Sequence, residues 1–213
     1  MVPNLLLQRS FAEDLTEPSA LYRVMDTTLL PAIVRVRASR KGLFAGQASF
    51  GRSASKTEWV YGFKVALVVD SDGVITAFGL APAASDERPI AEALIASDRH
   101  DAYLLADKGF TGIEWERRLW SFTGRWLRPH RTTTPAGHGR RPIGAGLASL
   151  GKRQIVEGVI YQLKEFYSLE SHRAKTLQGL LARLAAKVAA YTCAQRLNDS
   201  LGRPIRKLAN LLL

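Results

Sequence analysis

The sequence predicts a mixed α/β fold, in which helices flank a sheet. Short apolar runs rich in Val and Ile alternate with turn residues in the first half of the chain, and two long segments with helical periodicity occupy the last third. The 213 residues are 46% apolar, enough to bury a core in one domain. We expect this domain to span residues 21–213, after a short remnant or linker at residues 1–20.

The first half of the chain predicts three successive strands and then a helix. Residues 20–30 (ALYRVMDTTLL) form the first strand, and residues 61–70 and 73–83 form a hairpin around a turn. The stretch SDERP at residues 85–89 is typical of a helix start, because Ser or Asp caps the first turn and Pro is tolerated there. We assign Asp86 as this cap, and the helix continues through IAEALIAS.

The remainder predicts a strand, a helix, an extended segment and two long helices. A loop dense in Gly, Pro, Thr and Arg, expected to be mobile, separates the two long helices from the rest. The second long helix carries a wide Leu and Ala face suited to packing. In chain order the segments are a strand at 101–110, a helix at 111–120, an extended piece at 125–131, the loop at 130–146, and helices at 147–170 and 172–197.

Charge and cysteine usage limit the function classes. Thirty Lys and Arg against nineteen Asp and Glu give a net charge of +11, which attracts phosphate backbones or anionic membrane surfaces. No apolar run is long enough to cross a bilayer and no signal peptide is evident, so we expect a cytoplasmic protein. The single cysteine, Cys193, excludes an internal disulfide and is expected in the core. The four histidines lack helical i, i+4 pairing, so a metal would need carboxylate ligands.

Three acidic residues stand out by their positions. Asp26 lies within an apolar strand, Asp107 ends another, and Glu157 lies on a predicted helix on the same stripe as Arg153 and Lys164. A carboxylate in an apolar strand costs desolvation unless it is paired or binds a metal. Each has an ordinary alternative: a turn at Asp107, an Asx-type turn at Asp26, and an exposed ion pair between Arg153 and Glu157.

Taken together, the three carboxylates fit phosphoryl transfer assisted by two divalent ions. Magnesium suits such hard oxygen ligands, and we expect Mn²⁺ to substitute for it. Lys164 could then bind a phosphate, and Arg153 could orient a carboxylate or a phosphate oxygen.

Four motifs connect these residues to a known family. They read M-D-T-T at 25–28, Y-G-F-K at 61–64, A-D-K-G-F at 106–110 and R-Q-I-V-E-G-V-I-Y-Q-L-K at 153–164. In this order, from about residue 20 to residue 200, the chain resembles the catalytic domain of bacterial insertion-sequence transposases of the DDE type.

The resemblance implies an RNase H-like fold: a mixed sheet with a three-strand antiparallel meander plus parallel strands, flanked by helices. It implies that Asp26, Asp107 and Glu157 are the catalytic, metal-binding triad, holding two Mg²⁺ ions. The implied activity is DNA strand cleavage and strand transfer at the element's ends. The implied partners are double-stranded DNA and further copies of the chain, in the bacterial cytoplasm at the nucleoid.

Two departures from the family pattern stand out. The family's signature Tyr is replaced by Leu150, and only 25 residues precede Asp26, where such transposases carry a helical DNA-binding region. We therefore expect weakened recognition of the element's ends, as in a truncated or decayed copy or one half of a split product. The alternative function is a catalytically inactive DNA-binding fragment that regulates an intact transposase. A structure-specific RNase H-like nuclease is a third possibility.

Further basic and aromatic residues are predicted to contact DNA or to pack in the core. Three tryptophans, Trp115, Trp120 and Trp126, are expected in the core rather than stacked on bases. Phosphate contacts are also plausible for Arg52 and Lys56, which border Gly-rich sequence. The predicted DNA-binding residues are Arg153, Lys164, Arg35, Arg37, Arg40, Lys41 and Lys64.

Overall fold

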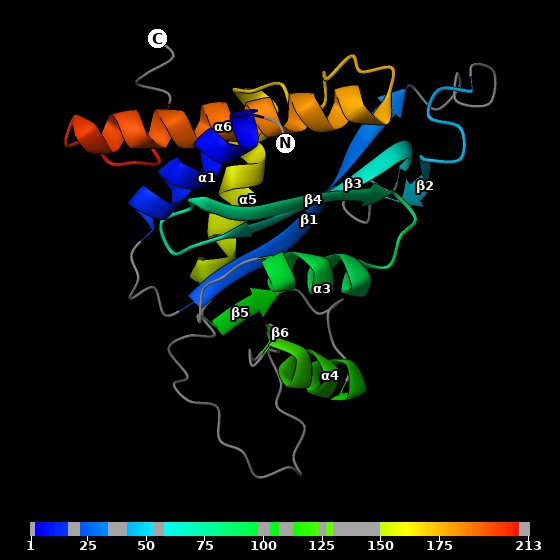
Figure 1. Ribbon diagram of the computed structural model, residues 1–213, viewed down its shortest axis with the longest axis horizontal. Coiled ribbons are helices and arrows are strands. Elements are labelled where there is room, and N and C mark those ends of the chain that lie inside the picture. Colours follow the sequence, from blue (N-terminus) through cyan, green and yellow to red (C-terminus); the bar gives the residue numbers. More distant parts are fainter. Residues whose placement is uncertain are drawn as a thin grey trace.

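The computed structural model describes residues 3–16, 22–33, 42–52, 58–97, 103–106, 113–123, 127–129 and 150–208. These residues form one sheet and the helices around it (Figure 1). The strands are β1 (Tyr22–Ile33), β2 (Ser49–Arg52), β3 (Trp59–Val69), β4 (Ile75–Pro82), β5 (Tyr103–Ala106) and β6 (Leu127–Pro129). The helices are α1 (Pro3–Leu15), α3 (Glu87–Ser97), α4 (Ile113–Thr123), α5 (Leu150–Glu165) and α6 (Leu177–Ser200).

The sheet combines antiparallel and parallel pairing. Strand β3 pairs antiparallel with β1 on one side and with β2 and β4 on the other, while β5 joins β1 in parallel and β6 joins β5 in parallel. The predicted three-strand meander is therefore β1, β3 and β4, and the parallel strands extend it beyond β1. This confirms the predicted RNase H-like α/β fold.

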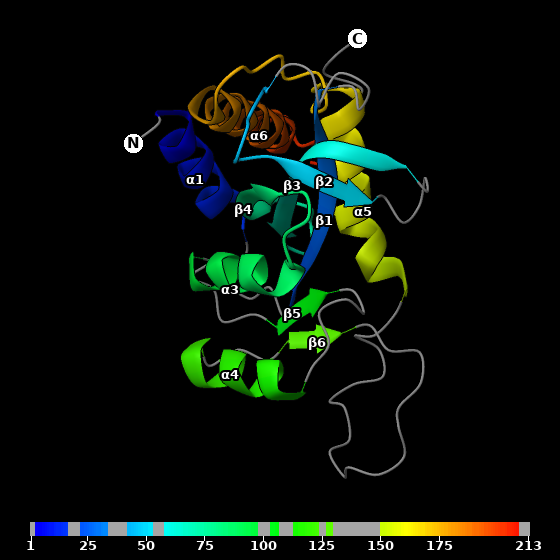
Figure 2. The ribbon, with the colours of Figure 1, turned by 90° about the vertical axis from the view of Figure 1, so that its right-hand side faces the viewer.

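Side chains alternate across the sheet, so each face has its own core. On one face, Val24 and Leu30 of β1 pack with residues of α5 and α6. On the other face, Met25 of β1 and Ala66 and Val68 of β3 pack with residues of α3 and α4. Figure 2 shows α5 on one side of β1 and α3 on the other. We call these the α5 face and the α3 face.

The turn between β3 and β4 is fixed from both sides. The carboxylate of Asp70, only 1% exposed, accepts the backbone N–H groups of Asp72 and Val74, each at 2.9 Å. Burial raises the pKa of Asp70, while those two hydrogen bonds act against the rise. Gly73 takes a positive φ of 79°, and its carbonyl accepts from Gln195 of α6 at 3.1 Å. The predicted turn is thus anchored to the last helix.

Gly62 of the Y-G-F-K motif lies directly against the backbone of β1. A Cβ atom at this position would stand 2.2 Å from the carbonyl oxygen of Leu30. Gly62 pairs with Pro31, next to an irregularity in the β1–β3 register between Pro31 and Ile33. Only glycine fits this contact without moving a strand.

Two elements were not predicted from the sequence. Residues 3–15, assigned only to a short N-terminal segment, form α1, which packs against α6 and β4. Its buried Gln8 donates from Nε2 to the carbonyl of Ile75 at 2.8 Å. The short strand β2 extends the edge of β3. Both elements are held by contacts distant in the sequence.

Some smaller assignments need correction. Trp115 is buried as expected, but Trp120 is 41% exposed and Cys193 is exposed rather than in the core. Trp126 and the loop at 130–146 lie outside the described residues. The backbone N–H of Arg88 donates to Oδ1 of Asp86 at 3.1 Å, which confirms Asp86 as the cap of α3.

Candidate active site

Asp26 lies near the middle of β1 on the α5 face. Val24 and Leu30, which share its face by alternation, belong to the core under α5 and α6. The partner of Asp26 on β3 is Leu67, also a member of that core. Asp26 itself is only partly buried. The strand therefore holds a carboxylate at a fixed position on an otherwise apolar face, within reach of water.

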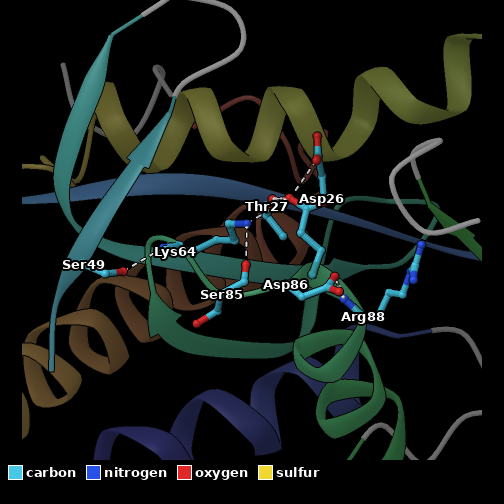
Figure 3. A network of polar contacts seen from close by, with 9 residues as sticks. Asp26, Thr27, Ser49, Lys64, Ser85, Asp86 and Arg88 are labelled. Atoms are coloured by element: carbon cyan, nitrogen blue, oxygen red, sulfur yellow. Dashed lines mark hydrogen bonds and ion pairs between the residues drawn. The ribbon is translucent and has the colours of Figure 1, made fainter. Parts of the chain in front are cut away.

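The backbone next to Asp26 holds its carboxylate in place. The N–H of Thr27 donates to Oδ1 of Asp26 at 2.7 Å. Figure 3 shows Asp26 and Thr27 side by side on β1. The Thr27 side chain lies on the α3 face, where its hydroxyl donates to Oε1 of Glu87 at 2.7 Å. Two adjacent residues thus present polar groups to opposite faces of the sheet.

Glu157 lies on α5, the helix that packs on β1 and β3. Val156, Val159 and Leu163 of this helix are at most 1% exposed and join the core of the α5 face. Glu157 lies outside this buried stripe and is exposed. Helix α5 therefore brings a carboxylate to the same side of the sheet as Asp26.

Asp107 falls outside the described residues. It directly follows Ala106, the last residue of β5. Strand β5 runs parallel to β1, with Val24 paired to Leu105. Leu105 packs against the core of the α5 face, whereas Leu104 and Ala106 belong to the core of the α3 face.

Two predicted DNA-binding residues of the motif at 153–164, Arg153 and Lys164, lie on α5, which begins at Leu150. The ammonium of Lys164 pairs with Oε1 of Glu170 at 2.8 Å, and its side chain is 27% exposed. The backbone of Arg153 is helical, and its side chain is not among the described ones. The helical backbone of α5 therefore places positions 153, 157 and 164 on one stripe, as the sequence predicts.

Lys64 has partners on the α3 face. Its ammonium lies 3.4 Å from Oε1 of Glu87 and donates to the carbonyl of Ser85 at 3.0 Å. Figure 3 shows Lys64 reaching from β3 towards Ser85. With the hydroxyl of Thr27 on the same Glu87 oxygen, these residues form a compact polar network. DNA binding by Lys64 remains a prediction.

Sequence reasoning did not identify this network. Glu87 looked like an ordinary acidic residue in the first turn of a helix, and nothing near it in the sequence points to Thr27 or Lys64. The remaining predicted DNA contacts, Arg35, Arg37, Arg40 and Lys41, lie outside the described residues.

Two carboxylates, Asp26 and Glu157, lie on the α5 face among the described residues. Within the described ranges, no group of three or more His, Cys, Asp and Glu side chains could hold a metal ion. That finding covers Asp26 and Glu157 but not Asp107. The donors present are carboxylate oxygens, one on a rigid strand and one on a longer side chain of a helix. Such hard oxygen donors fit Mg²⁺.

The described residues form an RNase H-like mixed sheet, with a strand carboxylate (Asp26) and a helix carboxylate (Glu157) on one of its faces. The chain matches the family described as "Transposase DDE domain" over residues 33–193, well over half of its length. It therefore belongs to this family of transposases, enzymes that act on DNA and in general use divalent metal ions. The matched region includes Asp107 and Glu157 and begins after Asp26.

No curated protein and no solved structure matched the chain significantly. Among the helices of the described residues, none combines the length and apolar character needed to span a membrane.

Proposed function

We propose that this chain catalyses metal-dependent DNA strand cleavage and strand transfer at the ends of an insertion sequence, acting as a homo-oligomer. Asp26, Asp107 and Glu157 are the proposed metal ligands. The register of the parallel β1–β5 ladder carries this proposal, because it relates the two aspartates across neighbouring strands.

Asp26 follows Val24 by two residues, and Asp107 follows Leu105, the ladder partner of Val24, by two residues. Continuation of the same register would set the two aspartates level on adjacent strands. Strand alternation would also give position 107 the same face as Leu105, which packs towards the α5 face. Both expectations lead to the face where Asp26 and Glu157 are described.

The three carboxylates would hold two Mg²⁺ ions. When bound, such a pair lowers the pKa of an attacking water or hydroxyl and stabilises the departing 3′ oxygen. The protein would hold the residues that bind the metal ions in fixed positions. Asp26 is held by β1 and by the N–H of Thr27, and Glu157 lies on a helix whose opposite side is buried. Carboxylates on packed elements need little reorganisation when ions arrive.

The cations of α5 would contact the DNA backbone. Lys164 shares a stripe with Glu157, and a DNA phosphate would compete with Glu170 for its ammonium. We propose that Arg153 orients a carboxylate or a phosphate oxygen from the same stripe. We propose additional phosphate contacts for Arg35, Arg37, Arg40 and Lys41, which would add to the salt dependence of binding.

A nicking assay tests the proposal. The substrate is a supercoiled plasmid carrying the coding sequence with several hundred base pairs of its natural flanking DNA, incubated with Mg²⁺ or Mn²⁺. The wild-type chain should nick or cut this plasmid at discrete positions, and EDTA should stop the reaction. Asp107→Asn should lose cleavage while it retains DNA binding.

Asp86→Asn is the matched control, because Asp86 is an exposed aspartate that caps α3. It should cleave like the wild type. Cleavage retained in Asp107→Asn would overturn the proposed site. Salt-sensitive DNA binding by the wild type without cleavage under either metal would favour the inactive regulatory fragment instead.

A further inference from the structure

The strands β2 and β3 present a row of aromatic and basic side chains. Phe50 pairs with Tyr61, and Arg52 pairs with Trp59, in the antiparallel β2–β3 ladder. Directly opposed residues point to the same face, and so do alternate residues along each strand. The side chains of Phe50, Arg52, Trp59 and Tyr61 therefore share one face, which we call the ribbon face.

Two aromatic residues of the ribbon face, Phe50 and Trp59, are exposed on paired strands. Phe50 is 45% exposed and Trp59 is 48% exposed. The rings of Phe50 and Tyr61 are 5.0 Å apart, and the hydroxyl of Tyr61 donates to the carbonyl of Leu43 at 3.1 Å. Neighbouring large aromatic side chains left open to water are typical of binding surfaces.

The ribbon face continues the α5 face of the sheet. Trp59 and Tyr61 alternate along β3 with the same phase as Phe63, Val65 and Leu67, which belong to the core under α5 and α6. Leu67 is the partner of Asp26. At about 3.3 Å per residue along the strand, Trp59 lies about 25 Å from the level of Asp26. A duplex spans that distance in about seven or eight base pairs. It would pass outside α5 and α6, since these helices cover Phe63, Val65 and Leu67 between the two sites.

We infer that the ribbon face binds the DNA duplex beside the cleavage position. The exposed Arg52 contacts a phosphate, and Trp59 and Phe50 contact sugars and base edges. This inference rests on the proposed function, since it takes DNA as the ligand and Asp26 as part of the cleavage site. DNA is favoured over a protein partner by the net charge of +11, by Arg52 within the face and by continuity with the face of the carboxylates.

The chemistry of the face fits a duplex. A two-stranded β-ribbon can enter the major groove, where aromatic and apolar side chains contact thymine methyl groups. Aromatic contacts with sugars and base edges involve no counterion release, whereas an arginine on a phosphate adds a salt-dependent term. The two kinds of residue should therefore leave different signatures in binding experiments.

Fluorescence anisotropy with a labelled 30-base-pair duplex of arbitrary sequence, without divalent metal and at several salt concentrations, measures these signatures. Trp59→Ala should weaken binding about tenfold with an unchanged salt slope, because it removes buried apolar area but no charge, and Trp59→Phe should restore most of the affinity. Arg52→Gln should lower the magnitude of the slope of log affinity against log salt by about one. Trp120→Ala is the matched control, because Trp120 is similarly exposed on α4 and should bind DNA like the wild type.

Equal DNA affinity in Trp59→Ala and Trp120→Ala would overturn the inference. So would a fall in molar mass by light scattering in Trp59→Ala at unchanged DNA affinity, since the face would then join two copies of the chain. If circular dichroism shows that Trp59→Ala is unfolded, the test is the salt dependence of DNA binding by Arg52→Gln. A slope equal to that of the wild type would overturn the inference. Binding is measured without metal, so this result is independent of cleavage. If the wild-type chain fails to cleave the plasmid but Trp59→Ala still weakens DNA binding, only the proposed function is contradicted.

Discussion

The two faces of the central sheet use their polar residues differently. On the α3 face, Glu87 accepts from Thr27 and pairs with Lys64, so a part-buried negative charge is balanced within the protein. On the α5 face, Asp26 and Glu157 retain exposed surface beside an apolar core. Asp26 and Thr27 are neighbours on β1, and strand alternation alone separates them. The comparison teaches that the α3 face uses charge for stability, and we propose that the α5 face uses it for chemistry.

The largest contrast is expected between two neighbouring substitutions on β1. Asp26→Asn should lower plasmid cleavage by about 1,000-fold or more, because an amide is a poor Mg²⁺ ligand, with little change in stability. Thr27→Val should retain cleavage and lose about 1 to 2 kcal/mol of unfolding free energy, because it removes the hydrogen bond to Glu87. Both predictions are tested by measuring the plasmid cleavage rate and the urea unfolding of each variant. Similar effects of the two substitutions on cleavage would erase the distinction between the faces.

Gly62→Ala probes the spacing of β1 and β3, on which both faces depend. The new Cβ would meet the carbonyl oxygen of Leu30 at 2.2 Å, so a strand must move. We expect a loss of about 2 to 4 kcal/mol in urea unfolding. Wild-type stability in this variant would show that the strands separate easily, and the register argument for Asp26 would lose its support.

The pair of Lys64 and Glu87 tests the α3 face directly. Lys64→Met should destabilise the fold by about 1 kcal/mol, because it leaves Glu87 without its cation. A double-mutant cycle with Glu87→Gln should return a favourable coupling energy of similar size. DNA affinity, measured on the same variants, addresses the predicted role of Lys64. A loss of affinity in Lys64→Met but not in Glu87→Gln would support DNA binding by this lysine.

His172 links the segment after α5 to β1 and should make stability depend on pH. Its Nδ1 accepts the N–H of Ala174 at 3.0 Å, so Nε2 carries the proton and donates to the carbonyl of Pro31 at 2.9 Å. Burial lowers the pKa of His172, and Arg183 and Lys187 lower it further. Below the ordinary value of about 6.5 the unfolded chain binds a proton that the folded chain resists, so stability should fall from pH 7 to pH 5.

The loss assigned to His172 should not exceed about 1.4 kcal/mol per pH unit, the limit for one proton. Urea unfolding at pH 7, 6 and 5 should show a flatter pH profile in His172→Gln than in the wild type. The raised pKa of Asp70 acts in the opposite direction, but it contributes equally to both proteins and cancels from their difference. Parallel profiles would mean that His172 protonates freely in the folded state.

The smallest expected effect is on the exposed side of α5. The structure shows no described atom within 4 Å of a Cβ added at Gly158, next to Glu157. Gly158→Ala should stabilise the fold by about 0.5 to 1 kcal/mol, because glycine lowers helix propensity. Thermal unfolding measures this gain. A loss of stability would indicate that the surface beside Glu157 is more crowded than it appears.

Much of the fold could be predicted because its signals are local. The alternating runs of β1, β3 and β4, the turn at Gly73 and the cap at Asp86 each show their cause within a few residues. Helices α5 and α6 have the predicted helical period, although α6 begins at Leu177, after Thr176 caps it. The start of α6 was placed too early because the residues between the helices fold back through contacts such as that of His172 with Pro31.

The unpredicted elements depend on distant contacts. Helix α1 exposes Leu6 and Leu7 and buries Gln8, which inverts the usual amphipathic pattern, because the side chain of Gln8 bonds to the backbone of β4. Strand β2 is too short to recognise and exists through pairing with β3. The sequence proposed Asp26, Asp107 and Glu157 as a triad from motif order. The sheet and α5 place Asp26 and Glu157 on one face, whereas Asp107 lies outside the described residues, so the triad stays a prediction. The partners of Lys64 could not be foreseen.

The most direct measurement is a crystal structure of the chain soaked with Mn²⁺, with data collected for anomalous scattering. We predict two manganese peaks about 3.5 to 4 Å apart, coordinated by carboxylate oxygens of Asp26, Asp107 and Glu157. The peaks should disappear in Asp107→Asn crystals grown in the same way. Manganese bound elsewhere, with Asp107 on a different face from Asp26, would contradict the proposed active site.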